Sequence, residues 1–174
     1  MKNTIPALTV FAGLPGVGKT TLAKIHAKDT QAVYLRVDNI ETPFLSLGNV
    51  EGQGYEATYN LARENLQLGN NVVVDLVNPL HTTRSMFVRL AKQTDVKLVQ
   101  FECVLSDELE HKRRVENRDS NDRYNPSWEE VESRVYDAWD EDRDGARTVI
   151  DTQNIDDAIN VIREKLIETT RGDE

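Results

Sequence analysis

The segment Gly13-Leu14-Pro15-Gly16-Val17-Gly18-Lys19-Thr20 constrains the fold of this chain more than any other. It follows an apolar run, residues 8–12, and precedes a helix-like segment, residues 21–25. Glycine lets the backbone turn tightly and approach an anion, and the free N–H groups of a first helical turn point at the bound group. A strand, this turn and a helix predict a phosphate-binding loop (P-loop) for a nucleoside triphosphate. In it, Lys19 contacts the β- and γ-phosphates and the Thr20 hydroxyl binds Mg²⁺.

Composition narrows the class of protein. A length of 174 residues suits one domain with a sizeable core, and we expect a single domain over residues 1–174. The formal net charge of −9 argues against nucleic acid or an anionic membrane as a partner. No apolar run is long enough to span a membrane and no signal-like segment begins the chain, so we expect a cytoplasmic protein. Cys103 lies in an apolar run and is expected to be a small strand residue.

Strand-like and helix-like segments alternate along the chain. Apolar and β-branched runs predict strands at 8–12, 32–37, 72–74, 96–105 and 147–151. Helices are predicted after the P-loop and at 55–68, 79–91, 106–118, Trp128–Trp139 and 155–166, with loops at 39–54 and 119–126. This order implies right-handed crossovers between parallel strands and helices on both faces of the sheet. We therefore predict a three-layer α/β sandwich around a five-stranded parallel sheet.

Acidic residues stand where predicted strands end. In parallel sheets, ligands bind beyond the carboxyl ends of the strands, where Asp38, Asp75 and Asp151 follow the second, third and fifth strands. Asp38 is placed to orient the hydroxyl of a phosphate acceptor, and the alternative is a capping role in its turn. Asp75 is expected to hold Mg²⁺ or a Mg²⁺-bound water, or alternatively to cap the turn before Asn78-Pro79.

Arginines are concentrated after the fourth predicted strand. Arg114 and Arg118 are four residues apart, hence on one helix face, and a polar loop with Arg123 follows. In a chain this acidic, the concentration suggests a lid over residues 113–126 that closes on the triphosphate. Arg114 and Arg118 would then stabilise the charge of the transition state. The alternative is a solvated helix face without a chemical role.

These segments together resemble a family of P-loop kinases, grouped with AAA-family ATPases, that includes zeta toxins, chloramphenicol phosphotransferase, gluconate kinase and the kinase domain of polynucleotide kinases. Arg36-Val37-Asp38-Asn39-Ile40 is similar to the strand-end segment that carries the family's base. Residues 74–79 are similar to the D-x-T-N-P segment of polynucleotide kinases, with Val77 in place of the threonine. Arg114-x-x-x-Arg118 resembles the lid arginines of adenylate-kinase-like enzymes, and Val149-Ile150-Asp151-Thr152 resembles the loop that lies against the adenine.

The resemblance implies a nucleoside-monophosphate-kinase-like sheet with strand order 2-3-1-4-5, and ATP and Mg²⁺ as cofactors. The nucleotide-binding residues expected on this basis are Gly13, Leu14, Pro15, Gly16, Val17, Gly18, Lys19, Thr20, Thr21, Arg114, Asp151, Thr152 and Asn154. The expected catalytic residues are Lys19, Asp38, Arg114 and Arg118, and the expected metal-binding residues are Thr20 and Asp75.

The leading hypothesis is an ATP-dependent kinase that phosphorylates a hydroxyl of a small molecule, as a monomer or homodimer. A polynucleotide 5′-hydroxyl kinase or a zeta-toxin-like nucleotide-sugar kinase is an alternative. Asn78-Pro79 favours it, while the net charge and the missing threonine oppose it. A nucleotide-binding regulatory ATPase without a small acceptor is a third hypothesis. The chain has no N-K-x-D motif to read guanine, which argues against a GTPase switch within that class.

Overall fold

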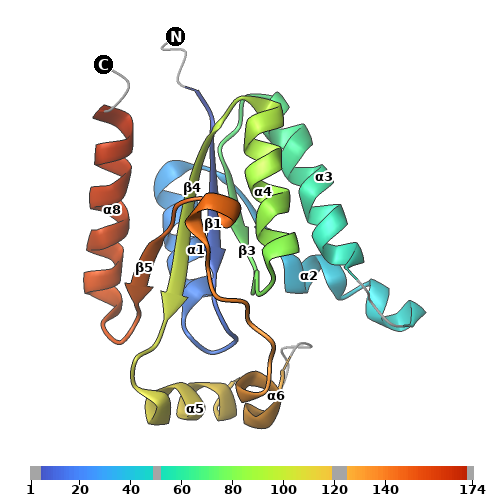
Figure 1. Ribbon diagram of the computed structural model, residues 1–174, viewed down its shortest axis with the longest axis vertical. Coiled ribbons are helices and arrows are strands. Elements are labelled where there is room, and N and C mark those ends of the chain that lie inside the picture. Colours follow the sequence, from blue (N-terminus) through green and yellow to red (C-terminus); the bar gives the residue numbers. More distant parts are fainter. Residues whose placement is uncertain (1–4, 49–51, 119–124, 172–174) are drawn as a thin grey trace.

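The strands of this protein pair in parallel into one sheet (Figure 1). A computed structural model of the chain describes residues 5–48, 52–118 and 125–171. Within these residues the sheet has five strands in the order β2-β3-β1-β4-β5. The strands are β1 (Ala7–Ala12), β2 (Val33–Arg36), β3 (Val72–Asp75), β4 (Lys97–Val104) and β5 (Thr148–Asp151). The predicted fold class and strand order are confirmed.

Helices cover both faces of the sheet. The main helices are α1 (Lys19–Thr30), α3 (Gln53–Gln67), α4 (His81–Thr94), α5 (Glu108–Glu116) and α8 (Ile155–Arg171). Shorter helices are α2 (Val37–Glu41), α6 (Trp128–Glu132), α7 (Glu141–Asp144) and the 3-10 helix η1 (Phe44–Leu47).

The alternation of side chains along the strands produces two cores. Phe11 and Val73 face α1 and α8, where they join Leu22 and Ile162 in one buried cluster. The residues between them, such as Val10 and Val74, point to the other face and pack against α3 and α4. Because strand side chains alternate with a period of two, burial on both faces requires the nearly continuous apolar runs seen in β1 and β3.

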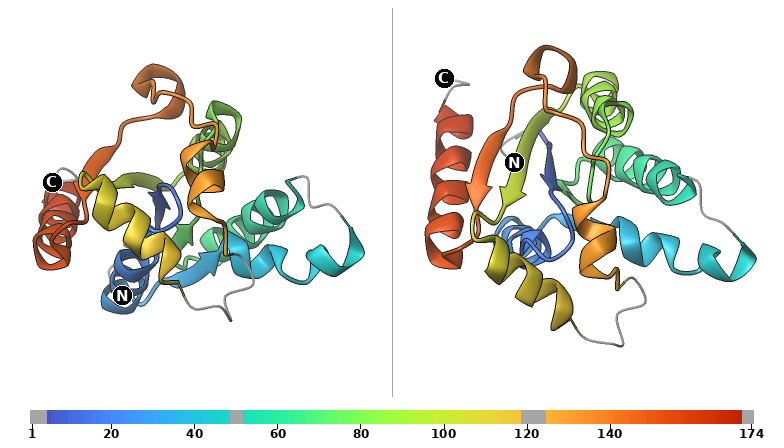
Figure 2. Two further views of the ribbon diagram at one scale, coloured as in Figure 1. Left: turned by 90° about the horizontal axis from the view of Figure 1, so that it is seen from below. Right: turned by 60° about the horizontal axis from the view of Figure 1, so that its bottom comes forward.

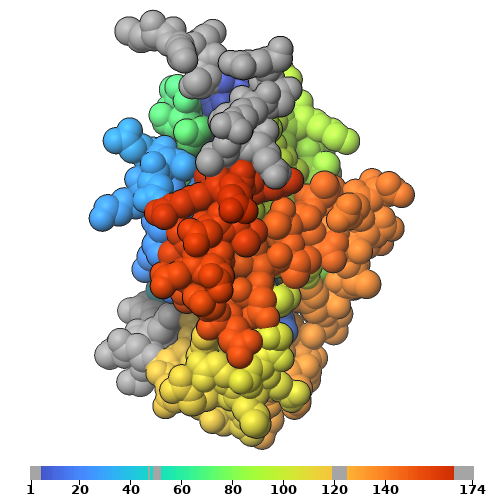
Figure 3. All heavy atoms as spheres, turned by 90° about the vertical axis from the view of Figure 1, so that its left-hand side faces the viewer, coloured from blue at the N-terminus to red at the C-terminus, as the bar shows by residue number. Residues whose placement is uncertain are grey.

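The carboxyl ends of the strands meet at one end of the molecule. α5 and α6 lie beyond this end, below the strands in Figure 1, and α5 crosses in front of the strands in the left view of Figure 2. Figure 3 shows α8 on the outer surface, with α5 below it. The P-loop joins β1 to α1 at the same end, so the sheet gathers the predicted site residues there.

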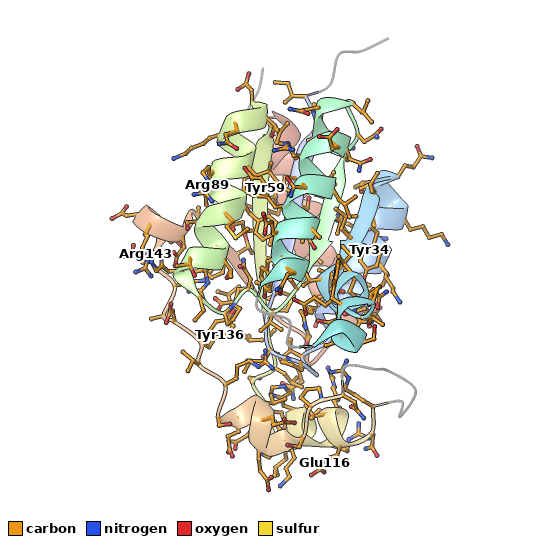
Figure 4. All side chains as sticks on the ribbon, turned by 90° about the vertical axis from the view of Figure 1, so that its right-hand side faces the viewer. Tyr34, Tyr59, Arg89, Glu116, Tyr136 and Arg143 are labelled. Atoms are coloured by element: carbon orange, nitrogen blue, oxygen red, sulfur yellow. The ribbon has the colours of Figure 1, made fainter. Side chains whose placement is uncertain are left out.

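The helix predicted over Trp128–Trp139 is wrong. α6 ends at Glu132, residues 133–140 have no regular structure, and α7 begins at Glu141. Val131 is buried, but Val135 is 69% exposed, so the apolar spacing does not form a helical core stripe. Figure 4 shows Tyr136 on this connecting segment, below the start of α4.

Contacts with the start of α4 explain why the helix stops. The Asp137 N–H donates to the Pro79 carbonyl (2.8 Å), and the Asp137 carboxylate accepts from the His81 N–H (3.0 Å). The rings of Tyr136 and Trp139 lie against the guanidinium of Arg84, at 4.9 and 4.5 Å from their centroids. In a continuous helix, the Asp137 N–H would bond within the helix, and Tyr136 and Trp139 would lose their contacts with Arg84. Tertiary contacts therefore override the local pattern.

Two predicted loops have a different outcome. Residues 39–54 contain the end of α2, η1 and the start of α3 rather than a uniform loop. Most of the predicted loop at 119–126, and with it part of the predicted lid, lies outside the described residues. Among the described helices, none has both the length and the apolar character that crossing a membrane requires.

Candidate active site

The P-loop has a backbone that requires glycine. Gly13, Gly16 and Gly18 have φ values of 143°, 88° and 91°. A Cβ at Gly13 would lie 2.4 Å from the Cys103 carbonyl oxygen, and one at Gly16 would lie 2.5 Å from a methyl group of Val115 on α5. Gly18 precedes α1, and no side chain of the described residues caps this helix start. The first-turn N–H groups of α1 can therefore receive an anion.

Lys19 is buried at the base of this loop. Its side chain is held toward the loop by a contact of Nζ with the Leu14 carbonyl at 3.4 Å. Burial lowers the pKa of Lys19, and the nearby carboxylates of Asp75 and Asp38 partly oppose that shift. The Lys19 side chain therefore lies in the field of both acids.

Asp75 is the centre of a hydroxyl cluster at the end of β3. One of its oxygens, Oδ2, accepts hydrogen bonds from the Thr20 hydroxyl and from the Tyr34 hydroxyl, each at 2.7 Å. Burial and the neighbouring Asp75 carboxylate raise the pKa of Tyr34, which keeps its proton in this bond. The structure thus brings together the two predicted metal-binding residues, Thr20 and Asp75.

The donor set of Thr20 and Asp75 fits Mg²⁺. Magnesium prefers oxygen ligands, keeps several waters and commonly binds through one or two protein oxygens plus substrate phosphates. The described residues hold no group of three or more His, Cys, Asp or Glu side chains that could bind a metal. A hydroxyl and a carboxylate beside the P-loop are therefore the protein contribution that this site can make.

Asp38 lies in the first turn of α2, close to Asp75. The guanidinium of Arg36 joins the two acids, with Nη2 at 3.0 Å from Asp38 Oδ2 and Nε at 3.9 Å from Asp75 Oδ2. Arg36 and Asp38 have side chains only 13% and 15% exposed. Arg36 and Tyr34 were not predicted to be site residues, although they are two residues apart and so lie on one face of a strand.

A cavity of about 180 Å³ opens in front of the P-loop. Its lining is strongly basic and consists of Gly16, Gly18, Lys19, Thr20, Arg36, Arg114 and Arg118. The two predicted arginines thus share one cavity with the P-loop lysine. Arg114 lies on α5, but Arg118 follows the end of that helix at Glu116, so the prediction of one helix face carrying both arginines is wrong. A basic cavity in a chain of net charge −9 is suited to a polyphosphate.

Arg114 is directed toward the loop after β5. Its Nε donates to Glu110 (2.8 Å), while Nη1 and Nη2 contact the Thr152 carbonyl at 3.3 and 3.4 Å. Thr152 is fully buried, and its hydroxyl donates to the Val17 carbonyl of the P-loop. Arg114 and Thr152 therefore border the P-loop directly.

Asp151 and Asn154 use their side chains within the same loop. The Asp151 carboxylate accepts from the backbone N–H of Gln153 (3.0 Å), and hydrogen bonding from Ser106 holds its pKa below the usual value. The Asn154 side chain accepts from the N–H of Asp156 at the start of α8 (3.0 Å). Both residues shape the loop beside Thr152.

His111 is a P-loop contact that the sequence analysis missed. Its Nε2 lies 2.8 Å from the Pro15 carbonyl, which can only accept, so Nε2 carries the proton. The Trp128 ring packs edge-on against the imidazole at 5.1 Å. Together with the contact of Val115 at Gly16, this packing fixes α5 against the P-loop.

Several polar side chains lie near Asp38 and the loop after β3. The Asn78 N–H donates to the Tyr55 hydroxyl (3.2 Å), and the Asn78 side chain is buried with no hydrogen-bond partner among the described residues. Burial and nearby Asp38 raise the pKa of Glu41, while Arg134 opposes the shift.

Arg84 secures the wall behind this cluster. Its fully buried guanidinium pairs with Asp144 at 3.1 Å and donates to the carbonyls of Asn78, Pro79 and Asp137. It thereby ties the loop after β3 to the segment between α6 and α7. Sequence reasoning missed this role, because an arginine at this position in a helix resembles a surface residue.

Solved structures with the same fold include two named kinases and a protein in complex with ADP-AlF3. The APS kinase CysC of Mycobacterium tuberculosis, in complex with AMPPNP and APS, has 17% sequence identity and a TM-score of 0.65, over 91% of this chain and 96% of that chain. A gluconokinase from Sinorhizobium meliloti 1021 has 17% identity and a TM-score of 0.61, over 90% and 89%. Chaetomium thermophilum Kti12, in complex with ADP-AlF3, has 19% identity and a TM-score of 0.68, over 92% and 97%.

These structures show the fold, but their low sequence identity does not show a family. A comparison with protein families does. No curated protein matches the chain. Residues 8–145 match the family AAA_33, described as an AAA domain, and this range includes the P-loop, Asp38, Asp75, Arg114 and Arg118. Because the match spans most of its residues, the chain belongs to the AAA domain family AAA_33.

Proposed function

We propose that this protein is an ATP-dependent kinase that transfers the γ-phosphoryl group to a hydroxyl of a small molecule. The observation that carries the proposal is the ion pair of Arg36 with Asp38 (3.0 Å) at the edge of the basic cavity. It sets a carboxylate that can orient an acceptor beside cations that can hold a triphosphate. Transfer of a phosphoryl group depends on this combination of positioning and charge neutralisation.

The P-loop amides and Lys19 bind the β- and γ-phosphates in this proposal. Thr20 and Asp75 would hold Mg²⁺, which supplies positive charge to the phosphate oxygens. Arg118, just after α5, stabilises charge on the transferred group. Arg114, with Thr152 and the backbone at Asp151 and Asn154, borders the adenosine side, and its contact with the Thr152 carbonyl supports this placement.

The acceptor hydroxyl approaches the γ-phosphorus from the side of Asp38. Its oxygen forms the new P–O bond while the bond between the γ-phosphorus and the bridging oxygen of ATP breaks, and ADP leaves. The hydroxyl proton passes to Asp38. Because the transition state is loose, Asp38 orients the hydroxyl first and receives the proton late.

A small acceptor is favoured over nucleic acid. The net charge of −9 disfavours a polyanion, and the similar gluconokinase and APS kinase are named for small molecules. We also propose a single domain over residues 1–174, with a lid near residues 113–126 that covers the bound nucleotide and excludes water.

A transfer assay tests this function. The purified protein, Mg²⁺ and ATP labelled in the γ-phosphate are incubated with panels of sugars, sugar acids, nucleosides and antibiotics, and with a 5′-hydroxyl oligonucleotide. We expect label on a small hydroxyl compound, and none with a Lys19→Met variant. Label on the oligonucleotide alone would favour a polynucleotide kinase. Acceptor-independent hydrolysis, stimulated by a protein partner, would instead favour a regulatory ATPase.

A further inference from the structure

We infer that Arg36 is a further catalytic residue, whose guanidinium binds the γ-phosphoryl group while that group moves toward the acceptor. The inference rests on the proposed kinase function and deepens it. Arg36 lies at the end of the edge strand β2, where the end of β3, the P-loop and the start of α2 meet.

The sheet register places Arg36 next to the metal-binding acid. Arg36 pairs directly with Asp75 between β2 and β3, and Asp75 in turn pairs with Phe11 on β1, just before the P-loop. Tyr34 lies two residues earlier on β2, hence on the same face, and its hydroxyl binds Asp75 Oδ2 at 2.7 Å. Both side chains therefore point at the carboxyl end of β3.

The guanidinium lies between the donor and acceptor sides. Arg36 lines the phosphate cavity together with Lys19 and Thr20, and it also holds Asp38 at 3.0 Å. Arg114 reaches the same cavity from α5, which lies beyond the carboxyl ends of the strands, and Arg118 reaches it from the residues just after that helix. Arg36 thus brings a cation from the sheet itself, at the point where the phosphoryl group must pass toward Asp38.

The chemistry of the transfer needs a cation at this point. The charge of the moving group is spread over its equatorial oxygens, and a planar guanidinium can donate two hydrogen bonds to them while it keeps Asp38 in place. Arg36 gives up no proton in the step. The γ-phosphorus loses its bond to the bridging oxygen of ATP and gains one to the acceptor oxygen, and the hydroxyl proton goes to Asp38.

A purely structural role predicts a different behaviour. If Arg36 only neutralises Asp38 and Asp75, its loss should weaken ground-state and transition-state complexes to the same extent. A catalytic contact, in contrast, is stronger in the transition state than in the ground state. The two roles are therefore separated by ligands that mimic the two states.

The experiment compares wild type with Arg36→Gln and Arg36→Lys. The dissociation constants of AMPPNP and of ADP with aluminium fluoride are measured with Mg²⁺ by calorimetry, alongside the rate of phosphoryl transfer. Arg89→Gln is the matched control, because Arg89 is exposed on α4 (Figure 4). Circular dichroism and thermal unfolding verify that each variant folds.

We expect Arg36→Gln to bind AMPPNP within about threefold of wild type, and to lose roughly 100-fold in affinity for the aluminium fluoride complex and in transfer rate. Arg36→Lys should fall between the two, and Arg89→Gln should match wild type. Equal losses for both ligands, or no loss for either, would overturn the role of Arg36. Failure of wild type to label any acceptor overturns the kinase function instead, and the two ligand affinities still report on Arg36.

Discussion

Asp75 shows how one buried oxygen atom can organise a site. Its Oδ2 receives the hydroxyls of Thr20 and Tyr34 and lies 3.9 Å from the Arg36 guanidinium. The carboxylate is only 1% exposed, so its orientation is set by these donors rather than by water. Residues that hold a metal-binding carboxylate in place affect metal affinity almost as strongly as the ligands themselves.

Removal of the Tyr34 hydroxyl should therefore weaken magnesium binding. We expect Tyr34→Phe to raise the Mg²⁺ concentration needed for tight ATP binding by roughly 10-fold, because Asp75 loses one of its two hydroxyl donors. Calorimetric ATP titrations over a range of Mg²⁺ concentrations measure this shift. Tyr59→Phe is the control, since its hydroxyl bonds Gln93 in an exposed position. Identical Mg²⁺ dependence in Tyr34→Phe and wild type would remove Tyr34 from the site.

At the scale of the elements, the packing of α5 on the P-loop determines the shape of the phosphate cavity. His111 bonds the Pro15 carbonyl, and Val115 leaves no room for a side chain at Gly16. The same helix carries Arg114 to the cavity, and Arg118 follows the end of the helix. A displacement of α5 should therefore alter nucleotide binding even when the P-loop sequence is otherwise intact.

Two glycines with matched backbones test this coupling. Gly16 and Gly69 have φ values of 88° and 86°, but only Gly16 has atoms within 4 Å of an added Cβ. Both Gly→Ala variants should lose about 1–2 kcal/mol of stability from the left-handed backbone. We expect ATP affinity to fall at least ~10-fold in Gly16→Ala alone, because the methyl group displaces Val115 and His111. Equal ATP affinity in the two variants would show that α5 does not control the loop.

Over the whole molecule, the regular part of the architecture was predictable because its signals are local. The P-loop motif, the apolar runs and their alternation with helices identify the sheet before any long-range contact is known. The proximity of Asp38 and Asp75 also followed, since the carboxyl ends of parallel strands meet at one edge. The order of the strands came from the family resemblance.

The remaining features depend on contacts between distant segments. The roles of Tyr34 and Arg36 require the register of β2 on β3, which pairs Arg36 with Asp75. The helix over Trp128–Trp139 was wrongly predicted because Tyr136 and Trp139 pack on Arg84. Arg84 precedes them in the sequence by 52 and 55 residues. Periodicity within one segment contains no information on such a partner.

The buried histidine of α1 makes the stability of the whole fold depend on pH. His26 is 4% exposed, lies 3.2 Å from the Thr9 hydroxyl, and has its pKa lowered by burial to about 4. An unfolded chain takes up this proton near pH ~6.5, before the folded protein does. The stability contribution is therefore complete above pH ~6.5 and is lost as the pH falls toward 4, by about 3 kcal/mol in total.

Urea unfolding between pH 4 and 7 measures this effect. We expect His26→Gln to lower stability at neutral pH but to remove much of the decline that wild type shows below pH ~6.5, because glutamine does not titrate. If the variant lost as much stability as wild type between pH ~6.5 and 4, the pH dependence would belong to other groups.

The proposed function of the whole protein requires transfer of phosphate to a hydroxyl that Asp38 holds. The most direct measurement is the single-turnover rate at which wild type and Asp38→Asn pass the labelled γ-phosphoryl group of ATP to the acceptor found in the panel. Asparagine keeps the size of the side chain but cannot receive the proton. We predict a rate at least ~100-fold lower in Asp38→Asn, with ATP affinity close to that of wild type. Equal transfer rates in the two proteins would contradict the central claim.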